Sequence, residues 1–428
     1  MNEHLYGFDT LCLHAGQIPD AATGARAAPI YQTTSFVFDS PEHAASLFNL
    51  QTFGNVYARL SNPTVAVLEE RIAALEGGRA AIAAASGLAA QAIAILNIAQ
   101  AGDEIVAART LYGGSYTQLD VTLRKLGITT HFVDPDEPEN FARAIGPRTK
   151  LIFAETIGNP SLNVIDIAAI ARVADQAGVA LFVDNTFASP YLCRPFEHGA
   201  AVVLHSATKF LGGHGTTLGG VVVESGRFPW DSGRYPSMIE PSEGYHGVRF
   251  FETFGDFGFI TKCRMEGLRT LGPALAPLSA FLLLQGVETL PLRMQRHCEN
   301  ALAVARFLEA HPQVRWVNYP GLPSGRYHVL AQRYLPKGAG AVLTFGIAGG
   351  AQAAARFIQS VEFLSHLANV GDAKTLVIHP ASTTHRQLSE EHLAAGGIGA
   401  DLVRISVGLE SIDDILWDID QALVAATR

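Results

Sequence analysis

Cysteine and positive charge are both scarce in this chain. Its 428 residues include only four cysteines, Cys12, Cys193, Cys263 and Cys298, and no two of them have the spacing of metal ligands. This small number of thiols argues against a disulfide framework and indicates a reducing compartment. We therefore expect a cytoplasmic protein. The net charge is −9, from 31 Lys and Arg against 40 Asp and Glu. A nucleic-acid partner is therefore not expected, because such binding depends on cations that neutralise phosphates.

An apolar leader and a long uninterrupted apolar run are also missing. Glu3 and Asp9 fall within the first ten residues, so no signal peptide is predicted there. The stretch that most resembles a membrane span, residues 80–101, is rich in alanine but is interrupted by Ser86 and Asn97. A strand followed by a turn and a helix explains it better than a span does. We expect no membrane partner.

Several common catalytic motifs are absent as well. GxSxG, HExxH and Walker A do not occur, and the 15 histidines are scattered, so no metal site is predicted. Ser206 and Lys209 match the SxxK motif of acyl-enzyme hydrolases, but the S-D-N and K-T-G partners of that motif are missing. The glycines of residues 213–219 miss the GxGxxG spacing by one residue, so a nicotinamide site is not expected.

The composition that is present is that of a globular protein with more than one domain. Apolar residues make up 48% of the chain and charged residues 17%, and the length is too great for a single hydrophobic core. Residues 1–60 are irregular and rich in Pro, Gly, Thr and aromatics, which predicts an arm. Residues 61–270 alternate short apolar runs with helical patterns, and residues 271–428 change to the pattern of a smaller α+β domain.

The alternation within residues 61–270 predicts an α/β domain built on a mostly parallel sheet. Its first helix is expected to begin at Pro63, with Asn62 as N-cap, and to end at Gly77. Ligands of such sheets bind at the carboxyl ends of the strands. The predicted strands are residues 80–85, 104–108, 130–134, 151–155, 180–184, 202–205 and 220–224.

The C-terminal part carries fewer and more widely spaced strand patterns. We predict one long helix over residues 278–311 and a final helix over residues 412–426. The predicted strands there are residues 314–319, 341–345 and 402–407.

Lys209 is the first candidate for chemistry. A lysine is usually a solvated surface charge, but Lys209 lies between an apolar strand and the glycine-rich residues 212–215, where ligands bind. A buried amine has a lowered pKa, which frees its lone pair to form an imine. Ser206 and Thr208 add hydroxyl groups that can hydrogen-bond a phosphate. This segment therefore suits a phosphorylated aldehyde cofactor.

Asp184 ends the predicted strand before the one that leads to Lys209. By itself an acid at a strand end is as consistent with a turn or a helix cap as with a ligand site. Paired with the lysine, it fits a carboxylate that holds a pyridine nitrogen protonated, with pKa shifts of about 1–3 units for such pairs. A protonated ring is what makes a pyridoxal cofactor an electron sink.

Two further segments follow predicted strands. Gly87 lies in a Ser-Gly-Leu tripeptide that opens a helix, where backbone N–H groups can bind an anion, although an ordinary strand-to-helix turn looks the same. Tyr112 can stack on a pyridine ring or handle protons, although isolated aromatic residues belong more often to the core.

A series of short motifs carries a stronger signal. They are residues 57–64 (Tyr-Ala-Arg-Leu-Ser-Asn-Pro-Thr), 86–88 (Ser-Gly-Leu), 112–113 (Tyr-Gly), 155–156 (Glu-Thr), 159–160 (Asn-Pro), 183–186 (Val-Asp-Asn-Thr), 206–209 (Ser-Ala-Thr-Lys), 379–381 (His-Pro-Ala) and 404–410 (Arg-Ile-Ser-Val-Gly-Leu-Glu). In this order, along nearly the whole chain, they resemble the cystathionine and methionine metabolism branch of the fold-type I enzymes that use pyridoxal 5′-phosphate (PLP). The resemblance implies a PLP-dependent transferase with a mostly parallel sheet in a large domain and a smaller α+β C-terminal domain.

The resemblance also implies a role for each matching residue toward the cofactor ring. Lys209 would hold PLP as a Schiff base and serve in catalysis together with Tyr112, which stacks on the ring. Asp184 would pair with the ring nitrogen, and Asn159 would contact the ring hydroxyl oxygen.

The remaining roles concern the phosphate and the substrate. The resemblance implies that the phosphate is bound by the backbone of Gly87 and Leu88 and by the hydroxyl groups of Ser206 and Thr208. Many relatives have Met at the position of Leu88, but that contact is through the backbone. Arg404, with its planar fork, would bind the substrate α-carboxylate, and Asn369 is also expected to contact the substrate.

Shared active sites are implied too. Tyr57 and Arg59, on the arm, would reach the phosphate of a neighbouring subunit's cofactor. The resemblance thus implies a homo-oligomer, a tetramer built from dimers with shared sites.

Two segments favour one reaction within the family. The synthases and lyases commonly have Ser-Leu-Gly where this chain has Asn369, Val370 and Gly371, and residues 228–257 form a longer stretch than in the lyases. Both features are similar to the O-acetylhomoserine sulfhydrylase group. This implies γ-replacement, in which O-acetylhomoserine and sulfide or methanethiol give homocysteine or methionine plus acetate. A cystathionine γ-synthase or a γ-lyase would use the same cofactor chemistry, and a catalytically silent PLP binder is the alternative of another class.

Overall fold

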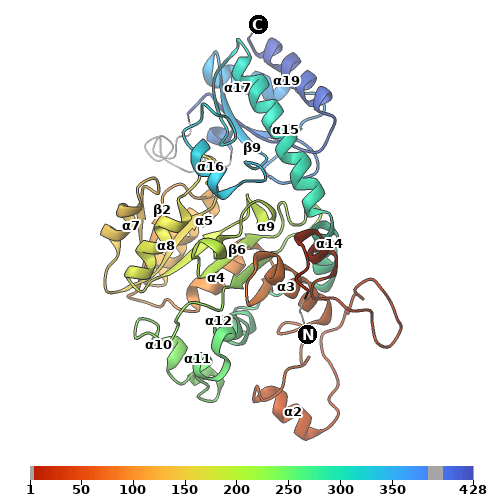
Figure 1. The fold of residues 1–428 in the computed structure, drawn as a ribbon, viewed down its shortest axis with the longest axis vertical. Helices are drawn as coiled ribbons and strands as arrows, with labels where there is room; N and C mark the ends of the chain where they lie inside the picture. The colour runs from red at the N-terminus through yellow and green to blue at the C-terminus, as the bar shows by residue number, and fades with distance from the viewer. Residues whose placement is uncertain (1–3, 384–398, 428) are drawn as a thin grey trace.

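The larger of two sheets forms the centre of the molecule (Figure 1). The computed structural model describes residues 4–383 and 399–427. Within them, the larger sheet has seven strands in the order β1-β7-β6-β5-β4-β2-β3. The strands are β1 (Ala80–Ala84), β2 (Glu104–Ala108), β3 (Thr129–Val133), β4 (Thr149–Glu155), β5 (Ala180–Asp184), β6 (Val202–Ser206) and β7 (Gly220–Glu224).

The larger sheet is mostly parallel, as the sequence predicts. Strands β2 to β6 run parallel to their neighbours, and only β7 is antiparallel, to both β6 and β1. The residues of β4, β6 and β7 are almost all buried, which explains why these strands appear in the sequence as continuous apolar runs. The predicted strand bounds agree with the structure to within two residues.

Helices surround this sheet. Helix α3 packs against β1 and β7, α4 against β6 and β7, and α8 against β5. The α-helices up to residue 271 are α1 (Phe8–His14), α2 (Pro41–Phe48), α3 (Pro63–Glu76), α4 (Gly87–Leu96), α5 (Gly113–Thr117), α6 (Leu123–Lys125), α7 (Pro138–Ala144), α8 (Ile167–Gln176), α9 (Ser189–Leu192), α10 (Pro236–Ile239), α11 (Phe250–Phe254), α12 (Gly258–Lys262) and α13 (Arg269–Leu271). The π-helical turns are η1 (Gln118–Thr122) and η5 (Cys263–Leu268), and the 3-10 turns are η2 (Pro195–His198), η3 (Glu243–Tyr245), η4 (Gly255–Phe257) and η6 (Pro380–Ser382).

The ends of α3 follow the predicted signals. The side chain of Asn62 accepts hydrogen bonds from the backbone N–H groups of Thr64 and Val65, which satisfies two donors of the first turn. Gly77 ends the helix at a φ of 71°, a left-handed conformation that glycine adopts without steric cost.

A second, smaller sheet forms the C-terminal part. It has five strands in the order β10-β11-β12-β9-β8 and is mainly antiparallel. Its strands are β8 (Val314–Asn318), β9 (Val342–Ile347), β10 (Ser365–His366), β11 (Leu376–Ile378) and β12 (Leu402–Ser406). Strands β10 and β11 were not predicted, because two or three residues are too few to show a pattern.

The single helix predicted over residues 278–311 is wrong, because the structure divides it. Helix α14 (Pro277–Glu288) ends before Thr289, and α15 (Leu290–Ala310) begins after it. Pro291 explains the break, since proline has no N–H group and its ring would clash with the carbonyl four residues earlier.

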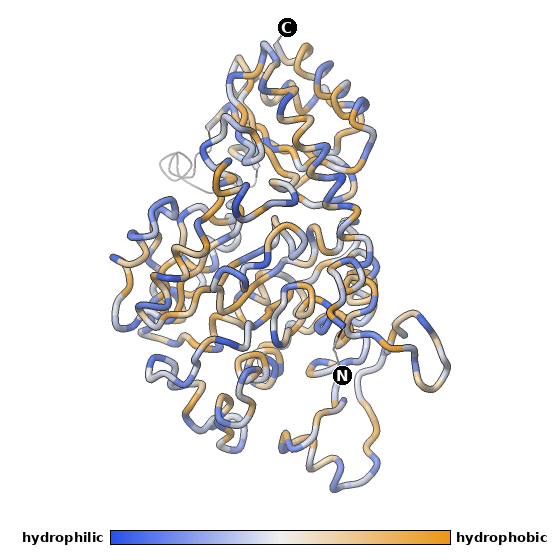
Figure 2. Tube along the Cα trace, viewed as in Figure 1, coloured by the Kyte–Doolittle hydropathy of each residue, from blue (hydrophilic) through white to orange (hydrophobic). Residues whose placement is uncertain are grey.

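Three further helices belong to the C-terminal part. They are α16 (His328–Tyr334), α17 (Gly350–Ser360) and α19 (Ile412–Thr427). Helix α17 packs against α19 and β9 (Figure 1), and apolar and polar residues alternate along these helices (Figure 2), as expected when one face is buried. Helix α14, by contrast, packs against α3. The division into residues 1–60, 61–270 and 271–428 remains a prediction.

Among residues 4–383 and 399–427, no helix is long and apolar enough to cross a bilayer.

Candidate active site

A cavity of about 260 Å³ opens at the carboxyl ends of β4, β5 and β6. This is the edge at which ligands of parallel sheets bind. Ten of the twelve residues predicted for the site line it: Gly87, Leu88, Tyr112, Asn159, Asp184, Ser206, Thr208, Lys209, Asn369 and Arg404. The other two, Tyr57 and Arg59, do not line the cavity.

Both sheets contribute to the cavity. The turns after β5 and β6 supply its floor, and the first turn of α4 supplies one end. Residues 368–370 and Arg404, on β12, come from the C-terminal part and complete the wall. The site is thus formed only when the two parts of the chain pack together.

Lys209 is half-buried in this wall. Its Nζ donates a hydrogen bond to Oδ1 of Asn369 at 2.5 Å. Burial, and secondarily the positive charge of Arg404, lower the pKa of Lys209 to about 8. The lowered pKa increases the fraction of neutral amine near neutral pH, the form that attacks a carbonyl or accepts a proton.

Asp184 ends β5 and faces the same cavity. Its Oδ1 accepts the backbone N–H of Thr186 at 2.9 Å. Burial raises the pKa of Asp184, and hydrogen bonds from Thr186 oppose that rise. A cationic ring nitrogen beside Asp184 would favour the carboxylate, since an opposite charge nearby lowers the pKa of an acid.

The first turn of α4 is suited to binding an anion. The Ser86 side chain accepts the N–H of Ala89 at 3.2 Å, so the N–H groups of Gly87 and Leu88 are the ones left for a ligand. A Cβ atom on Gly87 would lie 2.7 Å from Cβ of Ser206, so only glycine allows this approach of the helix to β6. The geometry fits the phosphate group of PLP.

Arg404 is buried beside the cavity without a carboxylate partner among the described residues. Its Nη1 donates to Oδ1 of Asn159 at 3.0 Å and its Nη2 to the backbone carbonyl of Asn369 at 3.2 Å. Burial lowers the pKa of Arg404 to about 10. A buried guanidinium of this kind is suited to a substrate carboxylate.

Tyr112 lies at the mouth of the cavity, with 46% of its surface exposed. It precedes α5, and its backbone N–H donates to Oε1 of Glu155 at 2.8 Å. The exposed ring leaves room for stacking on a flat ligand.

Tyr57 and Arg59 lie on the exposed arm. The Arg59 guanidinium lies over the Tyr57 ring, 5.0 Å from its centroid. A contact of these residues with another subunit's cofactor remains a prediction.

Among the lining residues to which the sequence assigned no role are Glu155 and Thr186. The hydroxyl of Thr186 accepts the N–H of Ser206 at 2.8 Å and its backbone N–H donates to Asp184, so it links the two strand ends. Both residues lie in motifs that carry the family resemblance, and this position in the motifs is the signal by which they could have been found.

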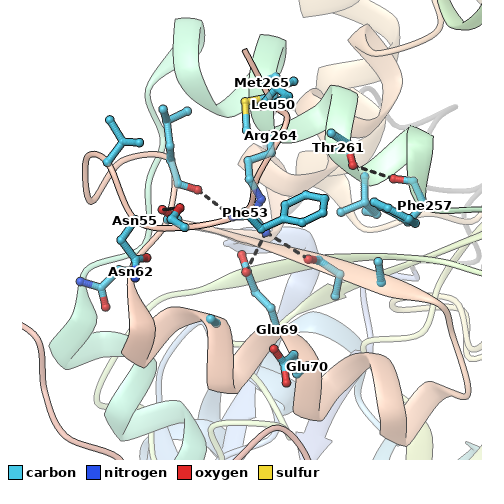
Figure 3. Close-up of a pocket in the computed structure, with 18 of the residues that line it drawn as sticks. Leu50, Phe53, Asn55, Asn62, Glu69, Glu70, Phe257, Thr261, Arg264 and Met265 are labelled. Carbon is cyan, nitrogen blue, oxygen red and sulfur yellow. Dashed lines mark hydrogen bonds and ion pairs between the residues drawn. The ribbon is translucent and has the colours of Figure 1, made fainter. Parts of the chain in front are cut away.

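A second, larger cavity, of about 720 Å³, lies between the arm, α3 and the α12–η5 segment (Figure 3). Arg264 spans it and bonds to the carbonyl of Leu60 and to the carboxylate of Glu69. None of the twelve predicted site residues lines this cavity. Its polar groups hold the arm against α3, so we assign it no chemistry.

Comparison with known proteins agrees with this geometry. An O-acetyl-L-homoserine sulfhydrylase of Leptospira meyeri is 54% identical over 97% of this chain and 96% of its own length. A homocysteine synthase of Schizosaccharomyces pombe is 54% identical over 98% of both chains. A solved structure is also similar, that of a Campylobacter jejuni protein assigned as an O-acetylhomoserine (thiol)-lyase. Its sequence is 40% identical to this chain, and the match covers 98% of this chain and 100% of that chain with a TM-score of 0.95. That crystal structure contains N′-pyridoxyl-lysine-5′-monophosphate.

The family model named Cys/Met metabolism PLP-dependent enzyme matches residues 9–424, which is nearly the whole chain. A cavity that joins a lysine, a carboxylate at a strand end and an anion-binding helix terminus is what such a cofactor requires. The chain therefore belongs to the Cys/Met metabolism PLP-dependent enzyme family.

Proposed function

We propose that this protein is a PLP-dependent transferase that carries out γ-replacement on O-acetylhomoserine. The reaction joins sulfide or methanethiol to Cγ of the substrate, releases acetate and yields homocysteine or methionine. The proposal rests on the cavity that brings Lys209, Asp184 and Arg404 together. The chain that forms this cavity is 54% identical to an O-acetyl-L-homoserine sulfhydrylase.

Each residue has a separate task in this proposal. When bound, PLP supplies an electron sink for negative charge that develops at Cα of the substrate. Asp184 keeps the ring nitrogen protonated, and Arg404 orients the substrate by its carboxylate. The amine of Lys209 accepts and returns the protons of Cα and Cβ, which one tethered base can do because its effective concentration is high.

Steady-state assays test the reaction. O-acetylhomoserine with sulfide or methanethiol is expected to give homocysteine or methionine with release of acetate, and only slow release of 2-oxobutanoate when no thiol is present. Parallel assays with the succinyl ester and with cysteine define the preferred ester and sulfur donor. Fast keto-acid release from methionine or cystathionine alone would instead make the protein a lyase.

We also propose that the protein is cytoplasmic and acts as a homotetramer built from dimers. The four free, buried cysteines support the first point. Exposed apolar side chains along residues 1–60, the predicted arm, support the second: Leu5, Tyr6, Leu13, Ile18, Ile30, Val37, Phe38, Phe48, Phe53 and Tyr57. The proposed partners are small molecules and further copies of the same chain.

Arg59→Ala is expected to weaken PLP retention about tenfold or more, because charged hydrogen bonds to a phosphate are among the stronger ones. Dialysis followed by absorbance of the retained cofactor measures this effect. Arg26→Ala, another exposed arginine of the arm, is the matched control and is expected to retain PLP normally.

A hybrid tests whether Arg59 acts in a neighbouring subunit's site. Arg59→Ala and Lys209→Ala chains are co-expressed with different tags and assayed at a PLP concentration at which the Arg59→Ala protein has lost its cofactor. One of the two shared sites then has both an intact lysine and an intact arginine, so activity is expected to return. A verified hybrid without activity would place Arg59 in its own subunit's site or outside any site.

A further inference from the structure

Glu155 is a buried acid in the cavity to which the proposed mechanism gives no task. It is the last residue of β4, only 7% of its surface is exposed, and it lies beside Asp184 in the register of the parallel strands β4 and β5. In such a pair, side chains at the same register point to the same face of the sheet. Two acids thus lie side by side in the lining of the candidate cofactor cavity.

The carboxyl group of Glu155 holds the backbone of Tyr112, which the proposed function places on the PLP ring. Its Oε1 accepts the N–H of Tyr112 at 2.8 Å. The backbone N–H of Asn159, in the turn after β4, also lowers the pKa of Glu155. Tyr112 comes from the turn after β2, so the Glu155 side chain ties that loop to the strand that lies beside Asp184.

The electrostatic surroundings favour a neutral hydrogen-bond acceptor over a charge-pairing group. Burial first, and the negative charge of Asp184 second, raise the pKa of Glu155 well above the ordinary value, while the two N–H groups lower it. Glu155 has no ion pair with a Lys, Arg or His of residues 4–383 and 399–427. The hydrogen bond shown for its carboxyl group among these residues is the one from the Tyr112 N–H, a donor that would be left unsatisfied without it.

We propose that Glu155 is a positioning residue that holds Tyr112 against the PLP ring by accepting its backbone N–H group. The inference rests on the cofactor roles in the proposed function. It does not depend on which amino acid is the substrate, because the ring is held before any substrate binds.

Two substitutions of Glu155 test the proposal in the holoenzyme. Glu155→Leu removes the acceptor, and we expect loss of most of the visible circular dichroism of bound PLP. We also expect kcat to fall roughly 10- to 100-fold, since a misplacement of about 1 Å can cost about 10²-fold. Glu155→Gln keeps a carbonyl oxygen at Oε1 and is expected to recover most of both signals, with KM within about threefold of the unaltered enzyme.

Glu224 provides the matched control. It is also the buried last residue of a strand in the same sheet, and its Oε1 accepts the N–H of Ile260 at 3.0 Å, but it does not line the cavity. Glu224→Leu is expected to lower the thermal unfolding temperature while the dichroism and kcat of the folded protein stay unchanged. If Glu155→Leu does not fold, Glu155→Asp takes its place, since it keeps the acid but withdraws it from the Tyr112 N–H by one methylene.

The outcomes separate positioning from mere stabilisation. Glu155→Leu, or its Asp substitute, with unchanged dichroism and kcat but a lowered unfolding temperature would overturn the proposal. Equal losses in the Gln and Leu variants would overturn it too, because charge and not the acceptor would then matter. Failure of the γ-replacement assay alone would leave the dichroism result intact, so the two proposals can fail independently.

Discussion

Lys209→Ala is expected to abolish turnover. The substitution removes the amine that we propose carries the cofactor and moves the substrate protons. General acid–base catalysis alone typically contributes about 10²–10⁴-fold, so kcat should fall by at least that factor. The lowered pKa of Lys209, about 8, and its hydrogen bond to Asn369 distinguish it from a solvated lysine.

Borohydride reduction followed by peptide mass spectrometry checks the assignment. In the unaltered protein the reduced cofactor should label the peptide that contains Lys209, and the Lys209→Ala protein should carry no covalent label. Lys374→Ala, an exposed lysine five residues after Asn369 in sequence, is the control and should be labelled and active. A label on any other lysine of the unaltered protein would show that the assignment is wrong.

Asp184→Asn is expected to lower kcat by roughly 10- to 1000-fold. The substitution preserves the shape of the side chain and an oxygen for the N–H of Thr186, but it removes the negative charge. Without that charge the pKa of the ring nitrogen should drop by about 1–3 units, and each unit corresponds to about 1.4 kcal/mol. The cofactor then accepts electrons less well.

The pH dependence of the visible spectrum and a PLP retention assay separate this effect from loss of the cofactor. The phosphate contacts expected at Gly87 and Ser206 do not involve Asp184, so PLP should remain bound. Asp256→Asn removes an acid that pairs with Arg79 and does not line the cavity, and it should leave kcat unchanged. Equal kcat in the Asp184→Asn and unaltered proteins would refute the electron-sink role.

Short-range patterns in the sequence were enough to predict the larger sheet. Each strand is a short apolar run between helix signals, and the caps of α3 are formed by the predicted residues Asn62 and Gly77. Such signals depend on neighbours along the chain. The break at Thr289 was not predicted, because one proline can be accommodated near a helix start. Strands β10 and β11 were not predicted, because segments of two or three residues show no periodicity.

The candidate site was predictable where residues lie directly after strands or within motifs. Lys209, Asp184 and Gly87 follow this rule, and Arg404 and Asn369 were found only through the resemblance to a family. Glu155 and Thr186 received no role, because their contacts join backbone groups of loops that are distant in sequence. Hydrogen bonds of that kind produce no recognisable spacing of residues in the sequence.

The sequence by itself determined which elements form and which residue types are available for PLP chemistry, because propensity, capping and apolar periodicity act over a few residues. Only the tertiary structure decided which groups meet. Packing of the C-terminal part against the larger sheet's part brings Asn369 to Lys209 and Arg404 to Asn159, and both Arg404 and Glu155 are buried. The pKa of Lys209 falls and that of Glu155 rises for the same physical reason, since burial disfavours whichever form is charged.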